Sequence, residues 1–206
     1  ATANSGYAFD GWYKGETLLG AVEGGETLSA ALATANLNKT EAGNYADTTY
    51  TAKFAKDDNG DGVPDKYQVA VTFKVENGSW NDKTAEDITV YVNLYKDGKF
   101  AEDGSGNLTT EQIPAVGNEP AEGYKAGTWD TTPDTTTAIS EAKTYTYTYA
   151  VDDSQTYTVT YTAGEGGSVS PASESDQVLS NTEIKGATAT ANSGYAFDGW
   201  YKGETL

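Results

Sequence analysis

The chain has 206 residues, and its 13 basic against 31 acidic residues give a formal net charge of −18 at pH 7. Every basic residue is a lysine, and an acidic surface without arginine is a poor partner for nucleic acid or anionic lipid. Histidine, cysteine and methionine are absent, which excludes a histidine-based triad, a cysteine nucleophile, a disulfide, and a zinc or copper site with nitrogen or sulfur ligands. No apolar run approaches the roughly 20 residues of a membrane-spanning helix, so membrane insertion is not expected.

The segment ATANSGYAFDGWYKGETL stands at residues 1–18 and again, letter for letter, at 189–206. The offset of 189 − 1 = 188 residues is far longer than the roughly 20–50 residues of solenoid repeats. It predicts whole domains in tandem, with neighbouring repeats as partners. The sequence then covers slightly more than one period and starts and stops inside a domain.

The stretch ETLSAALATANL at 26–37 predicts a short helix, because Leu28, Ala31, Leu32 and Ala35 fall on one face. TTEQI at 109–113, with a threonine cap, is a second candidate. The remaining patterned segments alternate aromatic or β-branched residues with polar ones, which is typical of half-buried strands. These segments are 48–55, 67–75, 87–95, 143–150 and 156–163. The predicted class is mainly β (α+β).

One motif carries metal chemistry, DDNGDGVPDKYQ at 57–68. Oxygen donors at alternate positions, a glycine for the turn and a backbone carbonyl follow the D-x-N-x-D-G calcium loop. The candidate calcium ligands are Asp57, Asn59, Asp61, the Val63 carbonyl and Asp65. The twelfth position, where a bidentate glutamate is expected, is Gln68, so a shorter loop closing on Asp65 is the better fit. The alternative is an Asp/Gly-rich linker that merely turns.

Two stretches of the chain share one plan: a Gly-Tyr turn, a tryptophan-bearing strand, a connector and a closing strand. GYAFDGWY at 6–13 is followed by TTYTAKFA, and GYKAGTWD at 123–130 is followed by KTYTYTYA. We therefore predict two related units per period. The predicted boundaries are 1–55 for the C-terminal part of one unit, 56–66 for the calcium-loop-like linker, 67–150 for the second unit, 151–155 for a linker and 156–206 for the N-terminal part of the next unit. The split unit could be completed within one chain, by head-to-tail association of two chains, or in a longer array.

The split unit resembles the internalin B-repeat, or Listeria-Bacteroides repeat, of bacterial surface proteins. The resemblance rests on Tyr157–Tyr161, Gly164–Gly167, Gly194–Tyr201 and the closing strand Tyr50–Phe54. It implies two small β-grasp-like units per period, each with a mixed sheet and at most one short helix. It also implies an extracellular address at the cell surface or cell wall and a role as a stalk or adhesive module, and it supplies no catalytic residues. The unit at 67–150 matches more loosely and has a longer middle.

Other candidate sites have simpler structural explanations. Trp12, Trp80, Trp129 and Trp200 could form a sugar-binding platform, but aromatic alternation in strands favours a core. No spacing singles out a pair of glycosidase carboxylates. The segments 164–167 and 104–106 are hairpin turns rather than phosphate-binding loops. Lys74 could form a side-chain crosslink to an Asn or Asp, but its place in the strand directs it outward.

The sequence thus predicts a non-catalytic stalk or spacer repeat of an extracellular bacterial surface adhesin. The alternative is a module that binds glycan or host protein on its aromatic faces, and an enzyme appendage ranks third. An exposed tryptophan cluster would favour the binding module.

Overall fold

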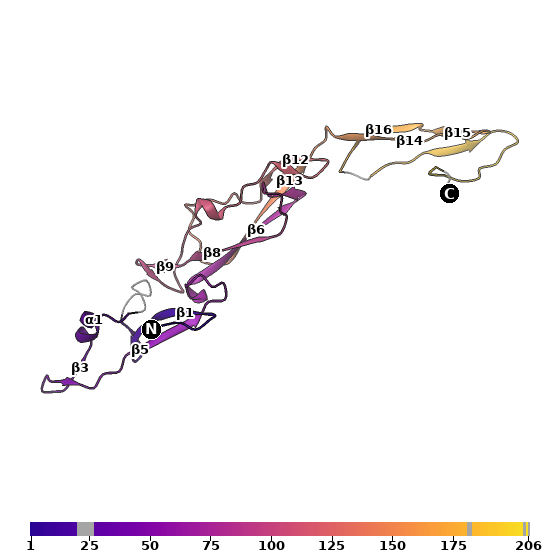
Figure 1. Cartoon of the computed structure of the whole chain (residues 1–206). Coiled ribbons are helices and arrows are strands. Elements are labelled where there is room, and N and C mark those ends of the chain that lie inside the picture. Colours follow the sequence, from indigo (N-terminus) through magenta and orange to yellow (C-terminus); the bar gives the residue numbers. More distant parts are fainter. Residues whose placement is uncertain (20–26, 181–182, 204, 206) are drawn as a thin grey trace. The chain divides into compact units, whose positions relative to one another are not determined.

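The computed structural model describes residues 1–19, 27–180, 183–203 and 205, and its elements are strands, one short α-helix and two 3₁₀ turns in that part of the chain (Figure 1). The mainly β class is therefore confirmed. The chain divides into two compact units that interleave along the sequence. Unit 1 comprises Ala1–Lys74, Glu86–Pro114 and Trp129–Thr146, and unit 2 comprises Val75–Ala85, Ala115–Thr128 and Tyr147–Leu206. The boundaries predicted from the sequence for the two related units and their linkers stay a prediction.

The first sheet of unit 1 joins β1 (Tyr7–Lys14), β2 (Thr17–Leu18) and β5 (Thr51–Lys56) in the order β2-β1-β5. β1 and β5 are antiparallel, with Phe9 opposite Phe54 and Trp12 opposite Ala52. The register shifts between Phe9 and Gly11, which makes Asp10 the extra residue of a β-bulge. As a result Ala8, Phe9 and Asp10 are all buried, where a regular strand would alternate.

The α-helix α1 (Ala30–Ala35) is shorter than the predicted 26–37 segment, whose first residue, Glu26, lies outside the described residues. It begins at Ser29, whose hydroxyl accepts the Leu32 N–H at 3.1 Å, and ends at Asn36, whose side chain donates to the Leu32 carbonyl. A small hairpin of β3 (Asn38–Lys39) and β4 (Tyr45–Ala46) follows. The candidate at 109–113 is the 3₁₀ turn η3 (Thr110–Gln112), capped by Thr109 as predicted.

The main sheet has the order β12-β13-β6-β8, made of β6 (Gln68–Glu76), β8 (Ile88–Asn93), β12 (Tyr124–Trp129) and β13 (Lys143–Val151). In unit 1, β6 and β8 pair antiparallel from Gln68↔Asn93 to Phe73↔Ile88. Phe73 is fully buried there, stacked on Tyr145 at 5.6 Å and edge-on to Trp129 at 6.0 Å. A small β9 (Tyr95–Lys96) and β10 (Lys99–Phe100) hairpin completes the unit.

Unit 2 contains the short pair β7 (Gly78–Ser79) and β11 (Glu119–Pro120), and the antiparallel pairs β14–β16 and β15–β17. The bounds of these last strands are Thr156–Thr160 for β14, Gly167–Ser170 for β15, Ser173–Val178 for β16 and Thr188–Ala191 for β17. Trp80 of this unit is buried, with 1% of its surface exposed. None of the helices in the described part of the chain has the length and apolar character to cross a membrane.

Candidate functional site

The most constrained polar group of unit 1 is the Asp10 carboxylate, which is 5% exposed. The β-bulge between Phe9 and Gly11 puts Asp10 on the buried side of β1. A buried carboxylate is costly unless it is paired and hydrogen-bonded. Tyr13 of the same strand donates to Asp10 Oδ2 at 3.5 Å, and the closer partners come from another segment.

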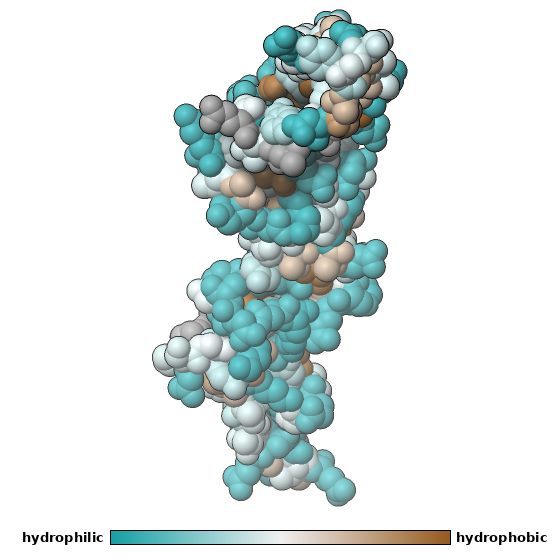
Figure 2. All heavy atoms as spheres, turned by 90° about the vertical axis from the view of Figure 1, so that its right-hand side faces the viewer, coloured by the Kyte–Doolittle hydropathy of each residue, from teal (hydrophilic) through white to brown (hydrophobic). Residues whose placement is uncertain are grey.

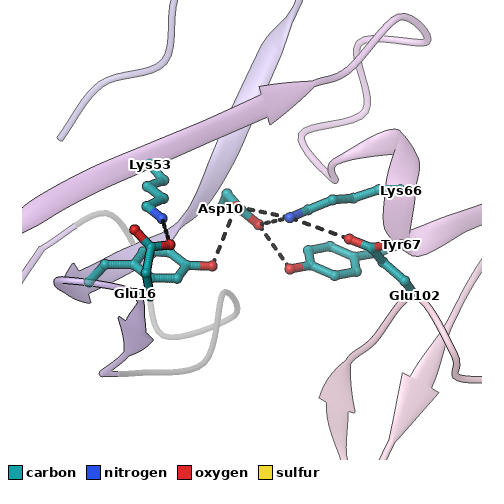
Figure 3. A network of polar contacts seen from close by, with 7 residues as sticks. Asp10, Glu16, Lys53, Lys66, Tyr67 and Glu102 are labelled. Atoms are coloured by element: carbon teal, nitrogen blue, oxygen red, sulfur yellow. Dashed lines mark hydrogen bonds and ion pairs between the residues drawn. The ribbon is translucent and has the colours of Figure 1, made fainter.

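The partners come from η2 (Asp65–Tyr67), the 3₁₀ turn that leads into β6 (Figure 3). The Lys66 ammonium lies 2.8 Å from Asp10 Oδ1 and 3.0 Å from Oδ2, and the Tyr67 hydroxyl donates to Oδ1 at 2.9 Å. Glu102 Oε1 lies 3.7 Å from the same ammonium. Asp10 is thus the common acceptor of two donors that are 56 and 57 residues away along the chain.

The protonation states follow from this geometry. Burial, and then the hydrogen bond to Asp10, raise the pKa of Tyr67 to about 12, so the phenol is neutral at pH 7. Burial alone would lower the pKa of Lys66, but the hydrogen bonds to Asp10 and Tyr67 reverse this and hold the pKa above its usual range. Neither group exchanges a proton near neutral pH, so the cluster does not act as an acid–base pair. It joins β1 to η2, and we call Asp10, Lys66 and Tyr67 together the latch.

The predicted calcium ligands lie in one loop whose oxygens accept backbone N–H groups. Asp57, which is 6% exposed, accepts the N–H of Gly60 at 2.8 Å and of Asp61 at 3.2 Å with Oδ1, and that of Gly62 at 3.0 Å with Oδ2. These bonds, from the third, fourth and fifth residues after Asp57, order the loop locally.

The other predicted ligands are placed as follows. Asn59 Oδ1 accepts the Asp61 N–H, Asp61 Oδ1 accepts the Val63 N–H, and Asp65 accepts the Asp58 N–H. Gln68, at the twelfth position, donates to Asp61 Oδ2 at 2.7 Å. The loop therefore brings Asp57, Asn59 and Asp61 together, whereas Asp65 bonds Asp58. Among the described residues, no three His, Cys, Asp or Glu side chains form a group that could hold a metal ion. Calcium binding stays a prediction.

The four tryptophans are not equivalent. Trp80 is in the core, and Trp12 and Trp129 are partly buried, but Trp200 is 43% exposed. The core interpretation is therefore wrong for Trp200, which stands in unit 2 beside exposed Tyr195, Phe197 and Tyr201. Lys74 points outward as predicted and pairs with Asp87.

The latch was not predicted from the sequence. Its signal is an Asp-Gly pair inside an otherwise apolar strand, YAFDGW, which is typical of a bulge. The sequence patterns assign Lys66 to the end of the loop motif, and Tyr67 both to this motif and to the start of the strand segment 67–75. Their contact with Asp10 depends on tertiary structure, because the sequence alone does not bring β1 beside η2.

Comparison with known proteins gives one family model that matches part of the chain. Residues 157–206 match the family model described as a divergent InlB B-repeat domain. No curated protein matches, and no solved structure matches.

The match supports an internalin B-repeat type module in this segment, which confirms the resemblance carried by 157–161, 164–167 and 194–201. The segment at 1–18 has the same letters as the last part of the matched region. The fold is β-rich, and residues 157–206 match the model of a repeat family that is associated with bacterial surface proteins.

Proposed function

We propose that the chain is a structural spacer of an extracellular bacterial surface protein. The spacer holds successive β-sheets along the chain in fixed positions and catalyses no reaction. The observation that supports it best is that the segment joining β5 to β6 is fastened at both ends to the same strand region. At its start the Asp57 N–H donates to the Gly6 carbonyl at 3.1 Å, and at its end Lys66 and Tyr67 hold Asp10. A connection of this kind resists bending, whereas a free Gly/Asp linker would not.

The interior of the connecting segment supports the same role. The carboxylates of Asp57 and Asp61 accept its own backbone N–H groups, so the loop is ordered by local bonds. The B-repeat match supports the surface location. The tandem array with a 188-residue period (189 − 1) belongs to this proposal and rests on the repeated segment.

Small-angle X-ray scattering on polypeptides of one, two and three periods tests the spacer role at high dilution. A spacer gives a maximum dimension that grows in proportion to the number of periods. A flexible chain of domains gives growth closer to the square root of that number. In the three-period polypeptide, Lys66→Met in every period should shift the result toward the flexible case, while Lys74→Met, at an exposed ion pair, should leave it unchanged.

A second function, ligand binding on an aromatic face, is favoured by the exposure of Tyr195, Phe197, Trp200 and Tyr201. Such rings stack on sugars and anchor protein partners. A glycan array would detect it, and the signal should be lost with Trp200→Ala and kept with Trp80→Phe. A blank array would leave the spacer as the function.

A further inference from the structure

The path of the chain through the main sheet begins and ends on two neighbouring strands. β6 and β13 lie side by side at the centre of the sheet, flanked by β8 and β12. The chain enters β6 at Gln68, directly after the latch residue Tyr67, and leaves β13 at Val151. Tension that is transmitted along the backbone through residues 68–151 must therefore pass through β6 and β13.

The contacts between these strands show that they run in the same direction. In unit 2, Glu76 Oε2 accepts the Thr148 hydroxyl at 3.0 Å, over a separation of 72 residues. The next residue along, Asn77, donates to the carbonyl of the next partner, Tyr149, at 3.4 Å and over the same separation. The numbers of the partners rise together, whereas in an antiparallel pair they would run in opposite directions. β6 and β13 are therefore a parallel pair inside a mixed sheet.

The backbone bonds between these strands are shielded from water. In unit 1, the Thr146 carbonyl accepts the Asp130 N–H, just after β12, at 2.9 Å. Since successive residues of a strand direct their backbone groups to opposite sides, the odd-numbered residues of β13 bond toward β6. Three of these odd-numbered residues are tyrosines with buried rings, and Phe73 of β6 stacks on the first, Tyr145. Water competes little for bonds above such a layer, so they break less easily than exposed ones.

The direction of the strands decides how they respond to tension. Tension pulls β6 by its first residue and β13 by its last, so the two parallel strands can separate only by sliding, which breaks all their bonds together. β1 and β5 provide the contrast, because they are antiparallel and Tyr7 lies opposite Lys56. The chain enters β1 and leaves β5 at this same end, and tension there opens one pair after another.

We propose that β6 and β13 form a tension clamp, which lets the chain transmit a pulling force along its backbone without unfolding. This function goes beyond the spacer role, which concerns resistance to bending. A stiff rod can be weak under tension, and a flexible string of domains can be strong. Forced unfolding depends on the rate at which the native bonds break, and a clamp loaded in shear lowers that rate.

The test compares two directions of pulling on the same strands. The chain has no native cysteine, so force can be applied through thiols at chosen exposed positions of the full chain. Asp58→Cys with Asp153→Cys pulls β6 and β13 from opposite ends. Asp82→Cys with Asp153→Cys is the matched control, because residue 82 follows the end of β6 and the two strands are then pulled from the same end.

Single-molecule force spectroscopy should give an unfolding force that is about twofold or more higher for the first pair than for the control pair. Urea midpoints of both variants, measured without force, control for any loss of stability that the substitutions cause. Equal forces in the two directions, or a higher force for the control pair, would overturn the proposal.

A second measurement needs no substitution and pulls the full chain by handles fused to its two ends. Rupture of the clamp frees 151 − 68 = 83 residue steps of about 3.4 Å, less a folded span of about 30 Å, and so lengthens the chain by about 250 Å. The step with the highest force should have this length. A highest-force step of a clearly different length would overturn the proposal. The scattering experiment on the spacer role applies no tension, so either proposal can fail while the other stands.

Discussion

Asp10 shows how one bulged residue sets the contacts of a whole segment. A regular β1 would place residue 10 on the opposite side from Phe9, but the extra residue turns both inward. The carboxylate is then buried and must find donors, which Lys66 and Tyr67 supply. Removing it would leave the partly buried Lys66 ammonium without its closest counter-charge, since Glu102 Oε1 lies 3.7 Å away.

Asp10→Asn should lower the free energy of unfolding by about 1–3 kcal/mol, because a hydrogen-bonded charge pair is lost from a buried position. Asp198→Asn is the matched control, since it changes the same letter of the repeated segment at an exposed position. Thermal and urea unfolding at low protein concentration measure both. An equal loss in the two variants would contradict the latch.

The latch also predicts the alkaline limit of stability. The folded-state pKa of Tyr67, about 12, is above its ordinary value of 10.0, so the folded chain keeps a proton that the unfolded chain releases. The pKa of Lys66 is raised as well. Stability from both groups is fully present below about pH 10 and falls as the pH rises toward about 12. Urea midpoints at about pH 9, 10 and 11 should decrease, and Tyr67→Phe should make the decrease shallower. A flat profile up to about pH 11 would contradict the assignment.

At the scale of the element, β13 shows how an alternating strand combines packing with hydrogen bonding. Tyr145, Tyr147 and Tyr149 are buried and the threonines between and beside them face outward or are half-buried, as the Thr-Tyr pattern predicts. In unit 2, the Tyr149 hydroxyl accepts the N–H groups of Gly117 and Glu119, each at 3.0 Å, and donates to the Ser79 carbonyl at 2.9 Å. One hydroxyl therefore joins β7 both to β11 and to the segment just before it.

Tyr149→Phe should destabilise the chain by about 2 kcal/mol, because two N–H groups and a carbonyl lose their partner while the ring still packs. Tyr91→Phe removes the same hydroxyl from a side chain that is 41% exposed and should change little. Urea unfolding measures both variants. Equal effects would show that the hydrogen bonds of the Tyr149 hydroxyl do not contribute to the free energy of unfolding.

The 57–68 loop carries the prediction of calcium binding. Carboxylates this close together repel unless a cation or backbone donors neutralise them, and in this loop backbone donors bond to Asp57. Calcium at about 1 mM should raise the melting temperature relative to chelator, and Asp61→Ala should remove the increase. Asp82→Ala, outside the loop, should keep it. Identical melting curves with calcium and with chelator would end the prediction.

At the scale of the whole molecule, charge opposes association. Hydrophilic residues cover most of the face shown in Figure 2, and hydrophobic ones appear there in small separate areas. A net charge of −18 makes two copies repel each other.

Much of the fold could be predicted from local sequence. The strands follow period-two patterns, and the helix and the turn at 109–113 follow their caps, because these features depend on neighbouring residues. The oxygen-rich loop and the outward Lys74 were predicted for the same reason. The latch could not be predicted, since Asp10, Lys66 and Tyr67 are far apart in sequence and meet only when β1 and η2 pack within unit 1.

The repeated segment shows most clearly what the local sequence determines and what the tertiary structure decides. Its letters fix the spacing of Phe and Trp, and the ring geometry is the same in both copies. They do not fix whether the segment forms a buried strand, as in β1, or an exposed stretch without strand structure, as at 195–200, because a strand needs the backbone groups of a neighbour to satisfy its own. The sequence by itself determined the β-rich class and the match to the B-repeat model. Only the tertiary structure decided that the buried Asp10 of β1 meets Lys66 and Tyr67, because this contact joins residues far apart along the chain.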